Sequence, residues 1–132
     1  MTISNIPLFS MLRTRMHWHQ ERQRVLAENV ANADTPRFQP RDLVAPNFDP
    51  RRPAASELTL TRTSSAHLAG AAGGTRFQLD RGNSGFEARP SGNAVSLEEE
   101  MMKVANNQMD FQAATSLYTR GLGMLKTAIG RR

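Results

Sequence analysis

The fold of this chain is decided by a segment near its C-terminal end, where residues 96–129 read SLEEEMMKVANNQMDFQAATSLYTRGLGMLKTAI. An apolar period of about 3.5 residues is typical of a helix that packs lengthwise against other helices. Alternating steps of four and three residues from Leu97 give ten seam positions, eight of them apolar or aromatic: Leu97, Met101, Val104, Gln108, Phe111, Thr115, Tyr118, Leu122, Leu125 and Ile129. We therefore predict a long C-terminal helix whose seam needs partner helices.

Both ends of this predicted helix carry the expected signals. Ser96 followed by Glu99 is a capping-box pattern, and the acidic residues 98–100 suit the positive end of the helix dipole. Gly130 and the two arginines after it suit the C-terminal end, where carbonyl groups are left over. At 1.5 Å per residue the helix would be about 50 Å long.

A second long helix is predicted from Asn5 to Ala31, with Asn5 as N-cap and Pro7 in the first turn. Polar residues in a seam fix the register between helices or mark a partly solvated turn, and the sequence leaves both interpretations open. The same stepping gives a seam that is apolar at its ends and polar in its middle: Phe9, Leu12, Met16, His19, Gln23, Leu26 and Val30.

The predicted fold class is mainly α, with the segments 1–36 and 96–132 forming one helical domain as an antiparallel, coiled-coil-like pair. Residues 37–95 form an irregular linker, because five of the seven prolines fall at positions 36, 40, 46, 50 and 53. Within the linker, Leu58–Thr61 alternates like a short strand and Phe77–Leu79 is its candidate hairpin partner.

Composition excludes several functions. The net charge is +5, but the basic residues are scattered, so no nucleic-acid footprint is predicted. There is no cysteine, no apolar run long enough to cross a membrane, and no cleavable signal peptide is expected at the N-terminus.

No catalytic, metal or cofactor site is predicted. His17 and His19 are two residues apart, so on a helix they point in nearly opposite directions, and His67 has no company in the sequence. No carboxylate pair and no nucleophile–base set falls in a recognisable motif. We therefore expect neither enzymatic activity nor a small-molecule ligand.

The end of the N-terminal helix is a specific string, Asn29-Val-Ala-Asn32-Ala-Asp34-Thr35-Pro36. This string resembles the signature near the N-terminus of flagellar rod and hook proteins. The flanking residues 23–27 and 41–43, together with the runs at 97–105, 107–113 and 125–129, look like the small proximal rod proteins of that family, over residues 8–43 and 91–132. One departure is Arg37, where the family usually has glycine after Thr-Pro. If that glycine supplies a left-handed turn, Arg37 is expected to be strained or the turn must differ.

The resemblance implies a structural subunit of the proximal rod of the bacterial flagellar basal body. Its terminal helices would assemble into the axial shaft that transmits torque, crosses the periplasm and surrounds the export channel. The implied partners are copies of itself, other rod proteins, the junction protein between the rod and the MS ring, and the export apparatus during secretion without a cleavable signal. The alternative is a basic coiled-coil adaptor or a nucleic-acid-binding module.

Two glycines inside the C-terminal helix, Gly121 and Gly123, also leave alternatives open. Each costs roughly 0.5–1 kcal/mol relative to alanine in a helix. They are either tolerated weak spots or positions where another backbone approaches closely.

Overall fold

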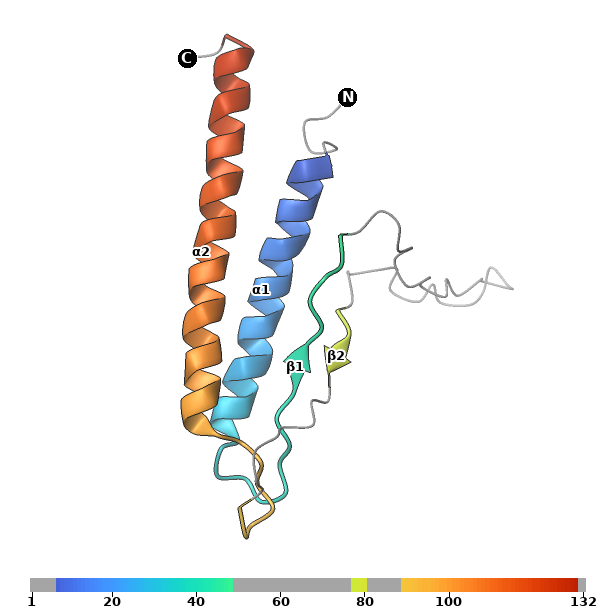
Figure 1. Cartoon of the computed structure of the whole chain (residues 1–132), viewed down its shortest axis with the longest axis vertical. Helices are drawn as coiled ribbons and strands as arrows, with labels where there is room; N and C mark the ends of the chain where they lie inside the picture. Colours follow the sequence, from blue (N-terminus) through green and yellow to red (C-terminus); the bar gives the residue numbers. More distant parts are fainter. Residues whose placement is uncertain (1–6, 49–76, 81–88, 131–132) are drawn as a thin grey trace, which may run out of the picture.

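The computed structural model describes residues 7–48, 77–80 and 89–130. Two helices, α1 (Pro7–Ala31) and α2 (Leu97–Ala128), run antiparallel, and two short strands, β1 (Asp42–Leu43) and β2 (Leu79–Asp80), lie on the side of α1 away from α2 (Figure 1). The chain is thus mainly helical with a small antiparallel sheet, as the sequence predicts.

Helix α1 ends where the sequence places its stop. The last helical residue is Ala31, and turns follow through Arg37. Thr35 precedes a proline, which disfavours the helical conformation, and the Asn32 side-chain amide donates to the Glu28 carbonyl at 2.8 Å. The predicted N-cap, Asn5, lies outside the described residues, and Pro7 begins the helix.

Helix α2 spans 32 residues, which at 1.5 Å per residue is about 48 Å. Ser96 is its N-cap, but the Ser96 side chain makes no capping hydrogen bond, so the predicted capping box is wrong. Glu99 instead pairs with Lys103 at 3.0 Å, one turn further along α2. At the other end Gly130 has φ +74°, the left-handed conformation expected of a glycine just past a helix.

The strand pairing differs from the prediction. Phe77–Leu79 was expected to pair with Leu58–Thr61, a segment that lies outside the described residues. Instead β2 pairs with β1 in antiparallel register, Asp42 opposite Asp80 and Leu43 opposite Leu79. The Val44 amide extends the ladder by donating to the Gln78 carbonyl at 2.9 Å.

Helix α1 buries two faces because it lies between α2 and β1 (Figure 1). Trp18, Val25 and Leu43 form the core on the strand side, with Phe77 packed against them. The Trp18 indole also donates to the Val44 carbonyl at 2.8 Å. The strand segment is therefore docked on α1 by both apolar and polar contacts.

Two charged side chains strengthen this docking. Arg22 makes a bidentate ion pair with Asp42, at 2.7 and 2.8 Å, and its guanidinium lies 5.2 Å from the centre of the Trp18 ring. Burial alone would raise the pKa of Asp42, but the hydrogen bonds from Arg22 and the Leu43 amide outweigh it, so the pKa is lowered. The pKa of Arg22 is raised, chiefly by the hydrogen bond to Asp42.

Candidate assembly site: the motif turn and the two faces of the C-terminal helix

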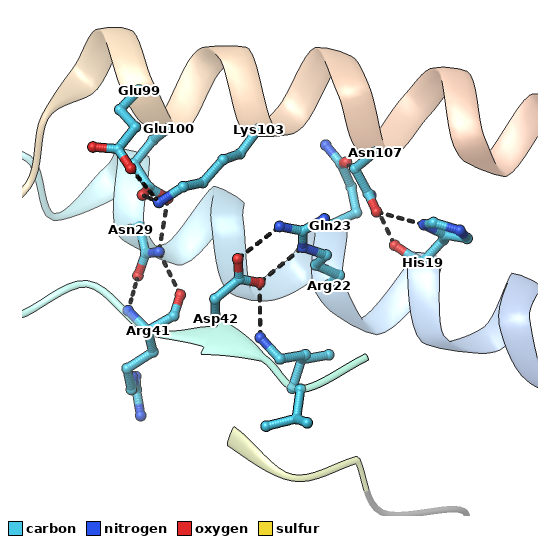
Figure 2. Close-up of polar contacts among 12 residues, drawn as sticks. His19, Arg22, Gln23, Asn29, Arg41, Asp42, Glu99, Glu100, Lys103 and Asn107 are labelled. Atoms are coloured by element: carbon cyan, nitrogen blue, oxygen red, sulfur yellow. Dashed lines mark hydrogen bonds and ion pairs between the residues drawn. The ribbon is translucent and has the colours of Figure 1, made fainter. Parts of the chain in front are cut away.

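The motif residue Asn29 joins three parts of the chain. Its side-chain amide donates to the Arg41 carbonyl at 2.7 Å and to a carboxylate oxygen of Glu100 at 2.8 Å. The Asn29 side-chain oxygen accepts from the Arg41 amide at 3.0 Å (Figure 2). Since Asn29 is 1% exposed, these bonds satisfy a polar side chain that would otherwise be costly to bury.

Asn93, just before α2, clamps the motif turn from the other side. Its buried amide donates to the carbonyls of Asn32 and Thr35, at 2.9 and 2.7 Å, which lie beyond the end of α1. Its side-chain oxygen accepts from the Val95 amide at 2.8 Å. The sequence reasoning missed this residue, because a single asparagine in a turn-rich stretch has no distinguishing spacing.

Arg37 adopts the left-handed conformation, with φ +60°. Of the two outcomes expected at Arg37, strain or a different turn, the left-handed φ corresponds to strain, because a side chain makes this conformation costly. The Arg37 amide donates to the Ser91 carbonyl at 3.2 Å, and a Cβ on Gly92 (φ +78°) would lie 3.5 Å from the Arg37 Cα. Two left-handed residues therefore meet where the turn after α1 packs against the turn before α2.

The rest of the motif turn faces outward. Asp34, Thr35, Pro36 and Arg37 are exposed, and the Asp34 carboxylate is 3.9 Å from the guanidinium of Arg89. The buried Asn29 of the motif and the buried Asn93 thus hold the fold together, whereas the residues at the tip of the turn are available to other molecules.

The face of α2 that meets α1 is polar or small at every seventh residue. The buried positions along the helix are Glu100, Asn107 and Ala114, and Gly121, one further step of seven along, is half-buried. Next to these positions lie the half-buried side chains of Val104, Phe111, Tyr118 and Leu125. We call these eight positions the inner face.

The inner face contains four of the ten predicted seam positions of α2, and the role of the whole seam in assembly stays a prediction. The half-buried set, one alternate half of the predicted seam, does face α1. By contrast Leu97, Met101 and Ile129 are exposed, and Leu122 is half-buried. The reason is that α1 packs against polar and small residues of α2 that lie next to those apolar positions. A count of apolar residues does not include them. On α1 all seven positions of the predicted seam are buried or half-buried.

Asn107 sets the register between the helices. Its amide donates to the His19 carbonyl at 2.9 Å and to the side-chain oxygen of Gln23 at 3.0 Å. Because the Asn107 amide nitrogen makes these two bonds, the Asn107 side-chain oxygen lies 2.8 Å from His19 Nδ1 (Figure 2). An amide oxygen can only accept a hydrogen bond, so His19 Nδ1 must carry the proton. The polar middle of the α1 seam is therefore a buried network and no solvated turn.

Glu100 is the second buried polar residue of the inner face. One carboxylate oxygen accepts from Asn29 and the other from Lys103, at 2.8 and 2.9 Å. Desolvation would lower the pKa of Lys103, but its hydrogen bonds to Glu100 and Glu99 prevail and the pKa is raised. Each oxygen of this buried carboxylate thus has a partner, as a buried charge requires.

Gly121 has a packing reason to be glycine. A Cβ at this position would lie 3.0 Å from Cζ and 3.1 Å from Cε1 of the Phe9 ring. Phe9 is buried and packs edge-on against Tyr118, with ring centres 5.5 Å apart. The close approach is therefore made by an aromatic ring of the same chain, whereas a Cβ at Gly123 would meet nothing within 4 Å.

Helix α2 carries six of the eleven large apolar side chains that are exposed in the described residues, and four of the six lie along its outer face. Met102, Met109, Leu117 and Met124 follow one another at spacings of seven, eight and seven residues, which places them along one side of the helix. We call these four residues the outer stripe. Next to its C-terminal end lies a shallow hollow around Gly123, lined also by Arg120, Thr127 and Ala128.

The described residues offer little support for a metal-binding, membrane-spanning or nucleic-acid-binding protein. Over the described ranges there is no cluster of three metal-ligating side chains, and neither helix is both long and apolar enough to span a membrane. His17 lies against the Phe77 ring, with 5.6 Å between ring centres, and His67 is outside those ranges. Five cations lie within ion-pair distance of carboxylates: Arg22, Arg24, Arg41, Arg89 and Lys103. These pairs do not favour a nucleic-acid-binding face.

Known proteins resemble this chain over most of its length. A family model described as "Flagella basal body rod protein" matches residues 12–39, which include the motif. A curated protein named flagellar basal body rod protein FlgB, from Agrobacterium fabrum, is 31% identical over 85% of this chain and 84% of its own. Proteins of the same name from Escherichia coli and Bacillus subtilis are 34% and 25% identical, over 73% and 82% of this chain and 73% and 81% of their own lengths.

Proposed function

Because this chain belongs to the FlgB family of flagellar basal body rod proteins, we propose that it builds the rod by docking the outer stripe of α2 on neighbouring subunits. Membership makes it a structural subunit of the rod. The proposal concerns which surface makes the contacts between subunits. One observation carries the proposal: the outer stripe is apolar and exposed on α2, the longer of the two described helices. The contact between α2 and α1, by contrast, is partly polar.

The two faces of α2 have different roles, one in holding α1 and the other in contacting neighbouring subunits. The inner face holds α1 in register through Asn107 and Glu100, and it leaves the four side chains of the outer stripe exposed. The outer stripe leaves large apolar side chains in water, which is unfavourable until another surface covers them. A subunit of a helical shaft needs two different contact surfaces, so that each copy can bind one neighbour on either side.

Other exposed apolar residues lie off the outer stripe and add to the candidate contact surface. Leu97, Met101 and Ile129 belong to the predicted seam, and they are exposed within the single chain. On α1, Leu8 and Met11 are also apolar and exposed. We assign all five to contacts between subunits, together with the accessible parts of Leu122 and Leu125.

We further propose the location and partners that the family implies. The subunit would lie in the proximal rod in the periplasm, around the export channel, and would transmit torque. Its partners would be copies of itself, the other rod proteins and the junction protein at the MS ring. The export apparatus would handle it during secretion. The exposed tip of the motif turn, Asp34–Arg37, is a second candidate contact surface for these partners.

The experiment replaces one residue of the outer stripe. Met109→Asp puts a carboxylate into the proposed subunit contact while leaving the α1–α2 contact intact, because Met109 is exposed. The matched control is Gln112→Asp, which puts the same carboxylate at an exposed polar position that does not belong to the outer stripe. Both genes replace the native gene in a flagellated bacterium, and swimming and the protein content of isolated basal bodies are measured.

We expect Met109→Asp to abolish swimming and to be missing from basal bodies, with normal export and normal helix content by circular dichroism. Gln112→Asp should swim and assemble. Normal swimming by Met109→Asp, or an equal loss in both variants, would overturn the assignment of the outer stripe as the contact surface.

A further inference from the structure

The outer stripe is built largely from one kind of oxidisable side chain. The chain has seven methionines and no cysteine, so thioethers are its only reduced sulfur. Four of these methionines, Met101, Met102, Met109 and Met124, lie on α2 with 60–70% of their surface exposed. Of the other two in the described residues, Met16 is half-buried on the inner side of α1 and Met11 is 38% exposed.

Other oxidisable side chains are better protected. Trp18 is 7% exposed and its indole nitrogen is hydrogen-bonded to the Val44 carbonyl. Tyr118 is half-buried against the Phe9 ring. A hydroperoxide that reaches the free chain therefore meets the methionines of α2 first.

We propose that the three methionines of the outer stripe, Met102, Met109 and Met124, are an oxidation site that controls assembly: a hydroperoxide converts them to sulfoxides in the free subunit, and the oxidised subunit does not join the rod. The inference rests on the function proposed above, because only a surface that docks on neighbours can lose docking when it becomes polar. The same contact would shield the methionines once the subunit is in place.

The chemistry of the step is a two-electron oxygen transfer. The thioether sulfur attacks one oxygen of hydrogen peroxide, the O–O bond breaks, and an S–O bond forms. Sulfur is oxidised to the sulfoxide, and the peroxide is reduced to water, which leaves with the remaining oxygen and both protons. A flexible apolar side chain becomes polar, and a polar group transferred into an apolar contact without a partner is unfavourable.

A purified full-length chain tests the chemical part. Graded hydrogen peroxide followed by peptide mass mapping gives the rate of sulfoxide formation at each methionine. We expect the rates at Met102, Met109 and Met124 to exceed the rate at Met16 several-fold. Equal rates at all four would overturn the proposal, because the exposure that singles out the outer stripe would then have no chemical effect.

Two triple variants in a flagellated bacterium test the functional part. Replacing Met102, Met109 and Met124 by leucine keeps the stripe apolar and nearly unchanged in volume but removes the oxidisable sulfur. Replacing the same three by glutamine makes the stripe permanently polar, as sulfoxides would. Met16→Leu is the control, since it removes a methionine that the proposal gives no role.

We expect the leucine variant, compared with its own untreated culture, to keep building new rods after a peroxide pulse that stops rod assembly in wild type. The Met16→Leu strain should be as sensitive as wild type, and the glutamine variant should not swim. If the leucine variant is as sensitive as wild type, oxidation elsewhere is responsible and only the redox inference fails. If the glutamine variant swims normally, the outer stripe makes no essential contact, which overturns both this inference and the proposed contact surface.

Discussion

Asn107 is the residue whose removal best tests how the two helices are held in register. It is 1% exposed, and its side chain makes three hydrogen bonds across the helix pair, to the His19 ring, the His19 carbonyl and Gln23. Asn107→Ala removes all three and leaves polar groups facing a small void. A typical hydrogen bond contributes about 1 kcal/mol net, and a buried group left without a partner costs about 1–3 kcal/mol.

We therefore expect Asn107→Ala to lower the free energy of unfolding by about 2–4 kcal/mol. The matched control is Asn106→Ala, the same substitution at an exposed neighbouring position, which should change it by less than about 0.5 kcal/mol. Urea unfolding of the full chain, followed by circular dichroism, measures both. If the two variants unfold at the same urea concentration, the network does not stabilise the pair and the argument from register fails.

Three further predictions concern backbone strain, charge and packing. Arg37→Gly relieves a left-handed conformation and should raise the free energy of unfolding by roughly 0.5–1 kcal/mol, whereas Gln39→Gly should lower it by a similar amount. The urea midpoints of the two variants should therefore shift in opposite directions from that of wild type. Because folding lowers the pKa of Asp42, its stabilising effect is present above the unfolded value of about 4 and is lost as the pH falls below it. Unfolding of Asp42→Asn should therefore depend less on pH between roughly 2 and 4 than that of wild type, and equal slopes would contradict the role of the ion pair. Gly123→Ala should stabilise α2 by about 0.5–1 kcal/mol, whereas Gly121→Ala should gain less or destabilise, because its methyl group meets an aromatic ring at 3.0 Å; thermal unfolding compares the two.

The sequence predicts the helices well because their signals are local and redundant. Apolar spacing, a proline in the first turn of α1, the Thr-Pro stop and Gly130 all act within a few residues of the chain. The strain at Arg37 was also predictable, since it follows from the resemblance together with the steric cost of a left-handed side chain.

The polar and small half of the inner face of α2 could not be found in the same way. Apolar residues occur on several sides of this helix, so counting them favours the register that begins at Leu97. The face that actually packs carries Glu100, Asn107, Ala114 and Gly121, whose burial depends on partners on α1. The available signal was the spacing of seven among small and polar residues, opposite the polar His19 and Gln23. Likewise Asn93 and the pairing of β1 with β2 depend on contacts between segments far apart in sequence.

The distribution of polar and apolar residues over α2 follows from the two tasks of a rod subunit. Apolar contacts are strong but tolerate sliding, because one large side chain fits many places on an apolar surface. Hydrogen bonds between Asn107 and α1 are weaker in sum but can form in one register only. A chain that must present the same surface in every copy benefits from hydrogen bonds between α1 and α2 and from apolar contacts between subunits. Leucine on the inner face would bind α1 more strongly, yet it would also let α2 shift by a turn and so misplace the outer stripe against its neighbours.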